Sequence, residues 1–130
     1  MKSVYQKILF YWLPLAVWLF VIFLFSSLPG IKTGFPHLID LILRKSAHVV
    51  IYLVLSWLIL RALRSGRKKK LTKKQLLLAF IFCFLYAVSD EWHQTFVPFR
   101  EGVWTDVGFD SVGAFLGLKL FSYNLKRFKK

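Results

Sequence analysis

The chain is poor in two kinds of residue that mark common classes of protein. Its 130 residues include a single cysteine, Cys83, which excludes a disulfide framework and leaves no cysteine pair for a zinc site. Only six residues are acidic, against nineteen lysines and arginines. Disorder is also excluded, because disordered chains are poor in hydrophobic residues, and these make up 57% of this sequence.

What the sequence has in abundance is long apolar runs, the first at residues 8–28. About 20 apolar residues suffice to cross the hydrocarbon core of a bilayer. A signal peptide is the alternative for this run, but the run is too long and no A-x-A-like cleavage site follows it. Three further runs predict an all-α, multi-pass membrane protein with a single domain, residues 1–130, and four transmembrane helices at about residues 8–28, 46–63, 75–94 and 107–125.

The basic residues predict how the chain is oriented in the membrane. They gather at the N-terminus, in segment 61–74 and at the C-terminus, whereas residues 90–110 hold five acids and one base, a net charge of −4. The positive-inside rule then puts both termini in the cytoplasm and residues 29–45 and 89–106 outside. The run at residues 68–70 could suit nucleic acid or anionic lipid, but a cytoplasmic loop near headgroups explains it, so we expect no nucleic-acid partner.

Polar side chains are expected inside the outer leaflet. Counting about 20 residues from each cytoplasmic boundary reaches charged residues on three of the helices. Such groups are costly at this depth, so they should turn inward and pair with one another. An ion-pair network that only holds the bundle together is the alternative, but the number of converging groups favours a functional site. The candidate ligand-binding residues are Lys45, His48, Tyr52, Asp90, Glu91, Gln94, Arg100, Asp106 and Asp110.

Helical periodicity groups these residues further. At about 100° per residue, Lys45, His48 and Tyr52 share one face of their helix, and Asp106 and Asp110 share a face with two glycines. The glycines have the small-residue spacing at which membrane helices approach closely. The same spacing would suit a homodimer through Gly113 and Gly117.

Three segments resemble the VanZ-like family of membrane proteins. Residues 45–52 match the pattern K-x-x-H-x-x-x-Y, and residues 90–100 match D-E-x-x-Q-x-F-x-P-x-R. Residues 106–117 are similar to D-x-x-x-N/D-x-x-G-x-x-x-G, and the order and spacing agree over nearly the whole chain. Phe99 and Glu101 depart from the pattern, since many members carry glycine and a small polar residue there. The resemblance implies a multi-pass protein of the bacterial cell membrane and a link to teicoplanin resistance, with no agreed chemistry.

The first functional hypothesis is a binding protein. An outer-leaflet pocket would recognise a membrane lipid, a lipid-linked cell-wall precursor or other cell-envelope intermediate, or a lipoglycopeptide. Lys45 and Arg100 would contact phosphate or carboxylate. The carboxylates of Asp90, Glu91 and Asp110 would orient these cations.

The alternative is an interfacial membrane enzyme that acts on a lipid or lipid phosphate. The candidate catalytic residues are His48, Asp90 and Glu91, as acid and base. The carboxylates could instead hold a divalent metal together with His48 and His93; no other cofactor is expected. The sequence contains no recognised catalytic signature, which leaves enzymatic activity open. A transporter or proton relay is a third hypothesis, and it would need a dimer.

Overall fold

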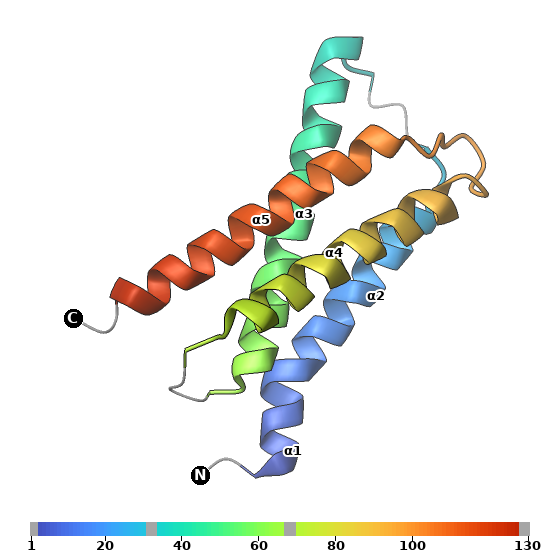
Figure 1. Cartoon of the computed structure of the whole chain (residues 1–130). Helices are drawn as coiled ribbons and strands as arrows, with labels where there is room; N and C mark the ends of the chain where they lie inside the picture. The colour runs from blue at the N-terminus through green and yellow to red at the C-terminus, as the bar shows by residue number, and fades with distance from the viewer. Residues whose placement is uncertain (1–2, 31–33, 67–69, 128–130) are drawn as a thin grey trace.

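The computed structural model describes residues 3–30, 34–66 and 70–127. Every regular element in these ranges is a helix and none is a strand, so the predicted all-α class is confirmed (Figure 1). The basic residues Lys2, Arg67, Lys68, Lys69, Lys129 and Lys130 of the orientation argument lie outside the described residues. The elements are α1 (Val4–Lys7), η1 (Ile8–Trp12), α2 (Leu13–Ser27), α3 (His37–Arg64), α4 (Lys73–Gln94) and α5 (Trp104–Arg127).

The first three elements follow one another without a break, as a single helix that contains a π-helical turn. Pro14 stands in the first turn of α2, directly after the π-helical residues of η1. Proline has no N–H to donate to the carbonyl four residues earlier, so the α-helical pattern cannot continue through it. A single π-helical turn is one way for a helix to absorb such an interruption.

The ends of α3 and α4 follow from local signals in the sequence. α3 begins at His37, nine residues before the predicted span 46–63, with Asp40 in its first turn and an Asp40–Arg44 ion pair of 2.7 Å one turn apart. It ends at Arg64, and the next two residues, Ser65 and Gly66, have φ angles of 43° and 74°. This left-handed conformation suits glycine and stops a helix. α4 begins with a capping box between Thr72 and Gln75.

Within the described residues, three helices are long and apolar enough to cross a membrane: Val4–Ser27, His37–Arg64 and Lys73–Gln94. The chain is therefore a membrane protein. α5 has 24 residues, about 36 Å of helix, but Asp106, Asp110 and Lys119 make it more polar than the other three. The prediction of four transmembrane helices is thus confirmed for three of them and not for the fourth.

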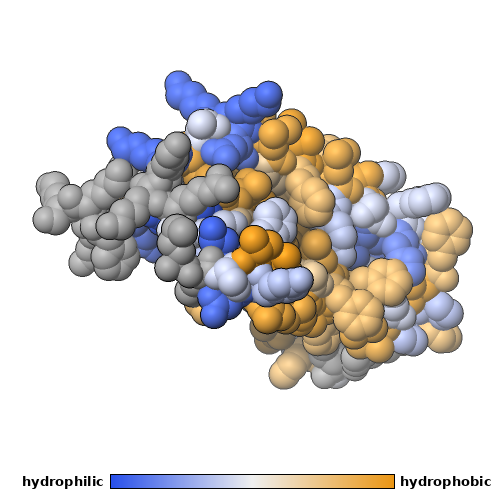
Figure 2. Space-filling view, turned by 90° about the horizontal axis from the view of Figure 1, so that it is seen from below, coloured by the Kyte–Doolittle hydropathy of each residue, from blue (hydrophilic) through white to orange (hydrophobic). Residues whose placement is uncertain are grey.

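The face of α4 that packs into the bundle carries small side chains, whereas α3 contributes large buried ones such as Leu60. α5 packs along α3 and α4, and α2 packs against the same two helices (Figure 1). Ala79, Cys83 and Ala87 succeed one another at every fourth residue of α4, and each is buried. Phenylalanines such as Phe20 and Phe25 are exposed instead. This arrangement is typical of membrane bundles, and Figure 2 shows the broad apolar surface it produces, with hydrophilic side chains gathered towards one side.

The closest approach of two helices is that of α5 to α3. A Cβ atom at Gly113 would collide with the backbone carbonyl of Val49, and one at Gly117 with the carbonyl of Leu53 and the hydroxyl of Ser56. The close approach expected of this glycine pair therefore occurs inside the chain. Both glycines are buried against α3, so a homodimer through Gly113 and Gly117 would need a different arrangement of these helices.

Candidate functional site

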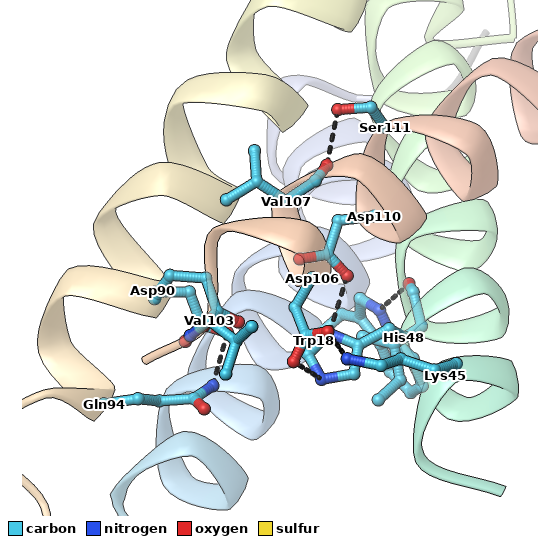
Figure 3. Close-up of polar contacts among 12 residues, drawn as sticks. Trp18, Lys45, His48, Asp90, Gln94, Val103, Asp106, Val107, Asp110 and Ser111 are labelled. Atoms are coloured by element: carbon cyan, nitrogen blue, oxygen red, sulfur yellow. Dashed lines mark hydrogen bonds and ion pairs between the residues drawn. The ribbon is translucent and has the colours of Figure 1, made fainter. Parts of the chain in front are cut away.

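Two basic residues of α3 face two carboxylates of α5. The ammonium of Lys45 forms an ion pair with Asp106, and Nδ1 of His48 lies 2.8 Å from Oδ1 of Asp110 (Figure 3). Nε2 of His48 lies 3.6 Å from Asp106, too far for a hydrogen bond. The pairs match because residues three or four apart share a helix face, so one turn of α3 meets one turn of α5.

This group is shielded from its surroundings to different degrees. The side chains of Lys45 and His48 are about one-fifth exposed, whereas that of Asp110 is fully buried. The ammonium of Lys45 also lies over the ring of Phe109, 5.5 Å from its centre. Lys45 therefore lies at the edge of the group and Asp110 at its centre.

α4 contributes three buried polar residues to the same region. The amide of Gln94 donates a hydrogen bond of 3.3 Å to Asp90 on the preceding turn. The backbone N–H of Val103 donates one of 2.9 Å to Oε2 of Glu91. Val103 directly precedes α5, so Glu91 ties the end of α4 to the start of the helix that carries Asp106 and Asp110.

Three buried oxygens in this region have no hydrogen-bond partner among the described residues. They are the hydroxyl of Tyr52, Oε1 of Glu91 and Oδ2 of Asp110. One ligand atom from each of His48, Glu91 and Asp110 lies within 4.8 Å of the others. Buried polar atoms normally have a partner, so these oxygens mark a place where something further can bind.

The hydrogen bonds of Arg100 and His93 go to α2 rather than to this group. The guanidinium of Arg100 donates a hydrogen bond of 3.0 Å to the carbonyl of Phe25, at the end of α2. Nε2 of His93 lies 3.0 Å from the hydroxyl of Ser27, and its ring lies 5.0 Å from that of Phe23. His93 is therefore not brought to the carboxylates near His48.

Two grooves flank the polar group. One has a volume of about 280 Å³ and lies against α4, with Phe23, Tyr86, Asp90 and His93 among its lining residues. The larger, of about 520 Å³, lies between α3 and α5, and its lining is apolar apart from Ser46 and the charge of Lys45. The residues of this larger groove are Leu41, Ile42, Lys45, Ser46, Val49, Val50 and Phe109.

Reasoning from sequence missed two contributors to the site. The hydrogen bond from Val103 comes from a backbone group, which no side-chain pattern reveals. Phe109 follows Asp106 by three residues, so helical periodicity could have placed it beside the partner of Lys45.

Comparison with known proteins places the chain in a family. The sequence profile of the VanZ/LLP1 family matches residues 10–127, nearly the whole chain. Searches of curated proteins and of solved structures found no significant match. The match includes all four long helices and each of the polar residues described above, and the chain therefore belongs to the VanZ/LLP1 family of membrane proteins.

Proposed function

We propose that this membrane protein binds an amphiphile with an anionic head, namely a lipid-linked cell-envelope intermediate. The observation that supports this most strongly is the ammonium of Lys45 at the wall of the larger groove, whose other lining residues are almost all apolar. An acyl or isoprenyl chain suits such a lining. A phosphate suits the ammonium at its edge.

The partners of Lys45 suit it to this role. Asp106 and the ring of Phe109 fix the position of its ammonium. An ammonium has three N–H donors, so the contact with Asp106 leaves others for a phosphate oxygen. Leu41 and Ile42, which line the same groove, are exposed on the outside of the bundle, so a lipid could enter laterally from the bilayer.

Our proposal includes an orientation in the membrane. α1 begins, and α5 ends, at the end of the bundle where α3 and α4 are joined (Figure 1). Arg61, Arg64, Lys73 and Lys74 flank that junction, so this end is cytoplasmic under the positive-inside rule. α5 crosses the membrane with the other three helices, and the groove beside Lys45 lies in the outer leaflet of a bacterial cell membrane.

A binding titration tests this function. The purified chain in neutral nanodiscs is titrated with a fluorescent polyprenyl phosphate, and Lys45→Gln is expected to weaken binding at least tenfold. Lys119→Gln is the matched control, because the ammonium of Lys119 also lies over a phenylalanine ring, 5.3 Å from the centre of Phe115. Lys119 is not part of the polar group. Equal affinity of the wild type and Lys45→Gln would contradict the proposal.

A second set of titrations identifies the class of amphiphile. Teicoplanin replaces the polyprenyl phosphate in one of them, and phosphatidylcholine replaces it in the other. Binding of teicoplanin alone, abolished by Lys45→Gln, would make the lipoglycopeptide the ligand and connect the chain to glycopeptide resistance. Equal binding of phosphatidylcholine would contradict recognition of an anionic head.

An interfacial enzyme acting on a lipid phosphate is the second candidate function. The 2.8 Å contact of His48 with the buried Asp110 favours it, because such a carboxylate fixes the orientation of an imidazole that transfers protons. Nε2 of His48 would take a proton from a water molecule that attacks phosphorus and return a proton to the departing alcohol. Release of phosphate or alcohol from a lipid phosphate by the wild type, and its loss in His48→Gln, tests this. No release by the wild type would exclude it.

A further inference from the structure

Three helices deliver nitrogen and oxygen ligands to one buried point. His48 comes from α3, Glu91 from α4 and Asp110 from α5, and one ligand atom of each lies within 4.8 Å of the others. Figure 3 shows how the side chains of His48 and Asp110 point toward each other across the gap between their helices. The three residues are far apart in sequence, so the fold itself creates this cluster.

In each carboxylate of this cluster, one oxygen contacts a neighbouring nitrogen and the other is available to a ligand. Oε2 of Glu91 accepts the hydrogen bond of Val103, and Oδ1 of Asp110 contacts Nδ1 of His48. The second oxygen of each, Oε1 and Oδ2, has no partner among the described residues. Glu91 is 2% exposed and Asp110 is 0% exposed, so water reaches neither from outside. A buried carboxylate oxygen without a donor is costly, and a bound cation would remove that cost.

The negative charge of the cluster is not balanced by the neighbouring basic residues. Lys45 is paired with Asp106, and Arg100 lies within electrostatic range of Asp90. This leaves two carboxylates, Glu91 and Asp110, against one imidazole. An excess of negative charge is unfavourable inside a membrane bundle. A divalent ion would neutralise it.

We propose that His48, Glu91 and Asp110 bind a divalent transition-metal ion of the zinc and manganese class. One imidazole with two carboxylates is a typical ligand set for these ions, whereas magnesium and calcium prefer oxygen ligands alone. Ligands at about 2.0–2.2 Å from a tetrahedral zinc ion lie about 3.4 Å apart, so the side chains would rotate inward by about 1 Å on binding. The unpartnered hydroxyl of Tyr52, one turn along α3 from His48, could bond to a water molecule on the metal.

The proposed metal site involves three specific ligands and not the other polar residues nearby. His93 is excluded, because it contacts Ser27 and Phe23 instead. Lys45 is not a ligand, so the metal site goes beyond the proposed lipid binding and does not depend on it. Protonation of one of the two carboxyl groups, that of Glu91 or that of Asp110, is the competing way to remove the excess negative charge.

Metal binding is tested directly on the full chain. The protein is purified in nanodiscs without a polyhistidine tag, stripped with a chelator and titrated calorimetrically with Zn²⁺, Mn²⁺ or Mg²⁺. We expect one Zn²⁺ or Mn²⁺ per chain, a higher Tm with the ion, and a much weaker response to Mg²⁺. Glu91→Gln and Asp110→Asn should lose at least tenfold in affinity. Glu101→Gln is the matched control, because Glu101 is an exposed carboxylate ten residues from Glu91, and it should bind as the wild type does.

Several results would overturn the metal site. If the wild type takes up no ion and its Tm is unchanged by Zn²⁺ and Mn²⁺, a protonated carboxyl group accounts for the cluster and there is no metal site. Unchanged affinity in a folded Glu91→Gln variant would also refute these ligands. Where a variant does not fold, the number of ions bound per wild-type chain and the Tm shift of the wild type decide whether the metal site exists. Lys45→Gln should keep the metal, so failure of lipid binding and failure of metal binding are distinguished.

Discussion

Nδ1 of His48 lies 2.8 Å from Oδ1 of Asp110, although 62 positions separate the two residues in the sequence. Asp110 is fully buried, and it reaches His48 because the glycines that follow it let α5 lie directly on the backbone of α3. The contact therefore joins the packing of the bundle to the polar group. A substitution that alters the helix packing should therefore affect the polar group, and a substitution in the polar group should affect the packing.

Removal of Asp110 should destabilise the protein strongly. Asp110→Ala leaves Nδ1 of His48 without its partner, and a buried polar group left unsatisfied costs about 1–3 kcal/mol. Unfolding of the purified protein in mixed detergent micelles, followed by circular dichroism, measures the loss. Asp40→Ala is the control, since its partner Arg44 is exposed and a pair one helical turn apart contributes only about 0.3–0.5 kcal/mol. Equal losses in the two variants would contradict the central position of Asp110.

A methyl group at Gly113 should separate α5 from α3. Its Cβ would collide with the backbone of Val49, which cannot rotate away, so Gly113→Ala should destabilise the protein by about 1–3 kcal/mol. Gly108→Ala in the same helix meets nothing within 4 Å and should be neutral or stabilising by up to about 1 kcal/mol. Tm values of the two variants in micelles check this. A stable Gly113→Ala variant that changes only its oligomeric state would contradict the packing inside the chain and support a homodimer.

Single cysteines test whether α5 crosses the membrane. In a Cys83→Ala background, Glu101→Cys should react with a membrane-impermeant maleimide on intact cells, whereas Lys74→Cys should react only after lysis. Tyr123→Cys, on an exposed position near the end of α5, should behave like Lys74→Cys. Labelling of Tyr123→Cys from outside would mean that α5 does not cross. Labelling of Lys74→Cys in intact cells would reverse the proposed orientation.

The helices and the inward faces of the polar residues could be predicted from sequence, because helical periodicity and the cost of charge in lipid act locally. Periodicity predicts the shared face of Lys45, His48 and Tyr52, and the cost of charge predicts that charged groups pair. The observed partner of Lys45 is Asp106 rather than one of the three carboxylates expected to orient it. The early start of α3 was missed although Asp40 and Arg44 signal it, because the span was counted by hydrophobicity alone.

Other features could not be predicted, because they depend on how the helices meet. The contact of Arg100 with the carbonyl of Phe25 depends on the turn that follows α4. The hydrogen bond from Val103 to Glu91 depends on the path of a connection between helices. The spacing of the glycine pair suits either a neighbouring copy or a neighbouring helix, and the contact of Gly113 with Val49 is visible only in the structure.

The most direct test of ligand binding beside Lys45 is mass spectrometry of the lipids that co-purify with the protein. The wild type and Lys119→Gln should carry a lipid-linked phosphate enriched over the bulk membrane, and Lys45→Gln should lose it while reaching the same abundance in the membrane. The same bulk phospholipid profile in all three proteins would contradict the proposal that this family member binds a specific anionic lipid.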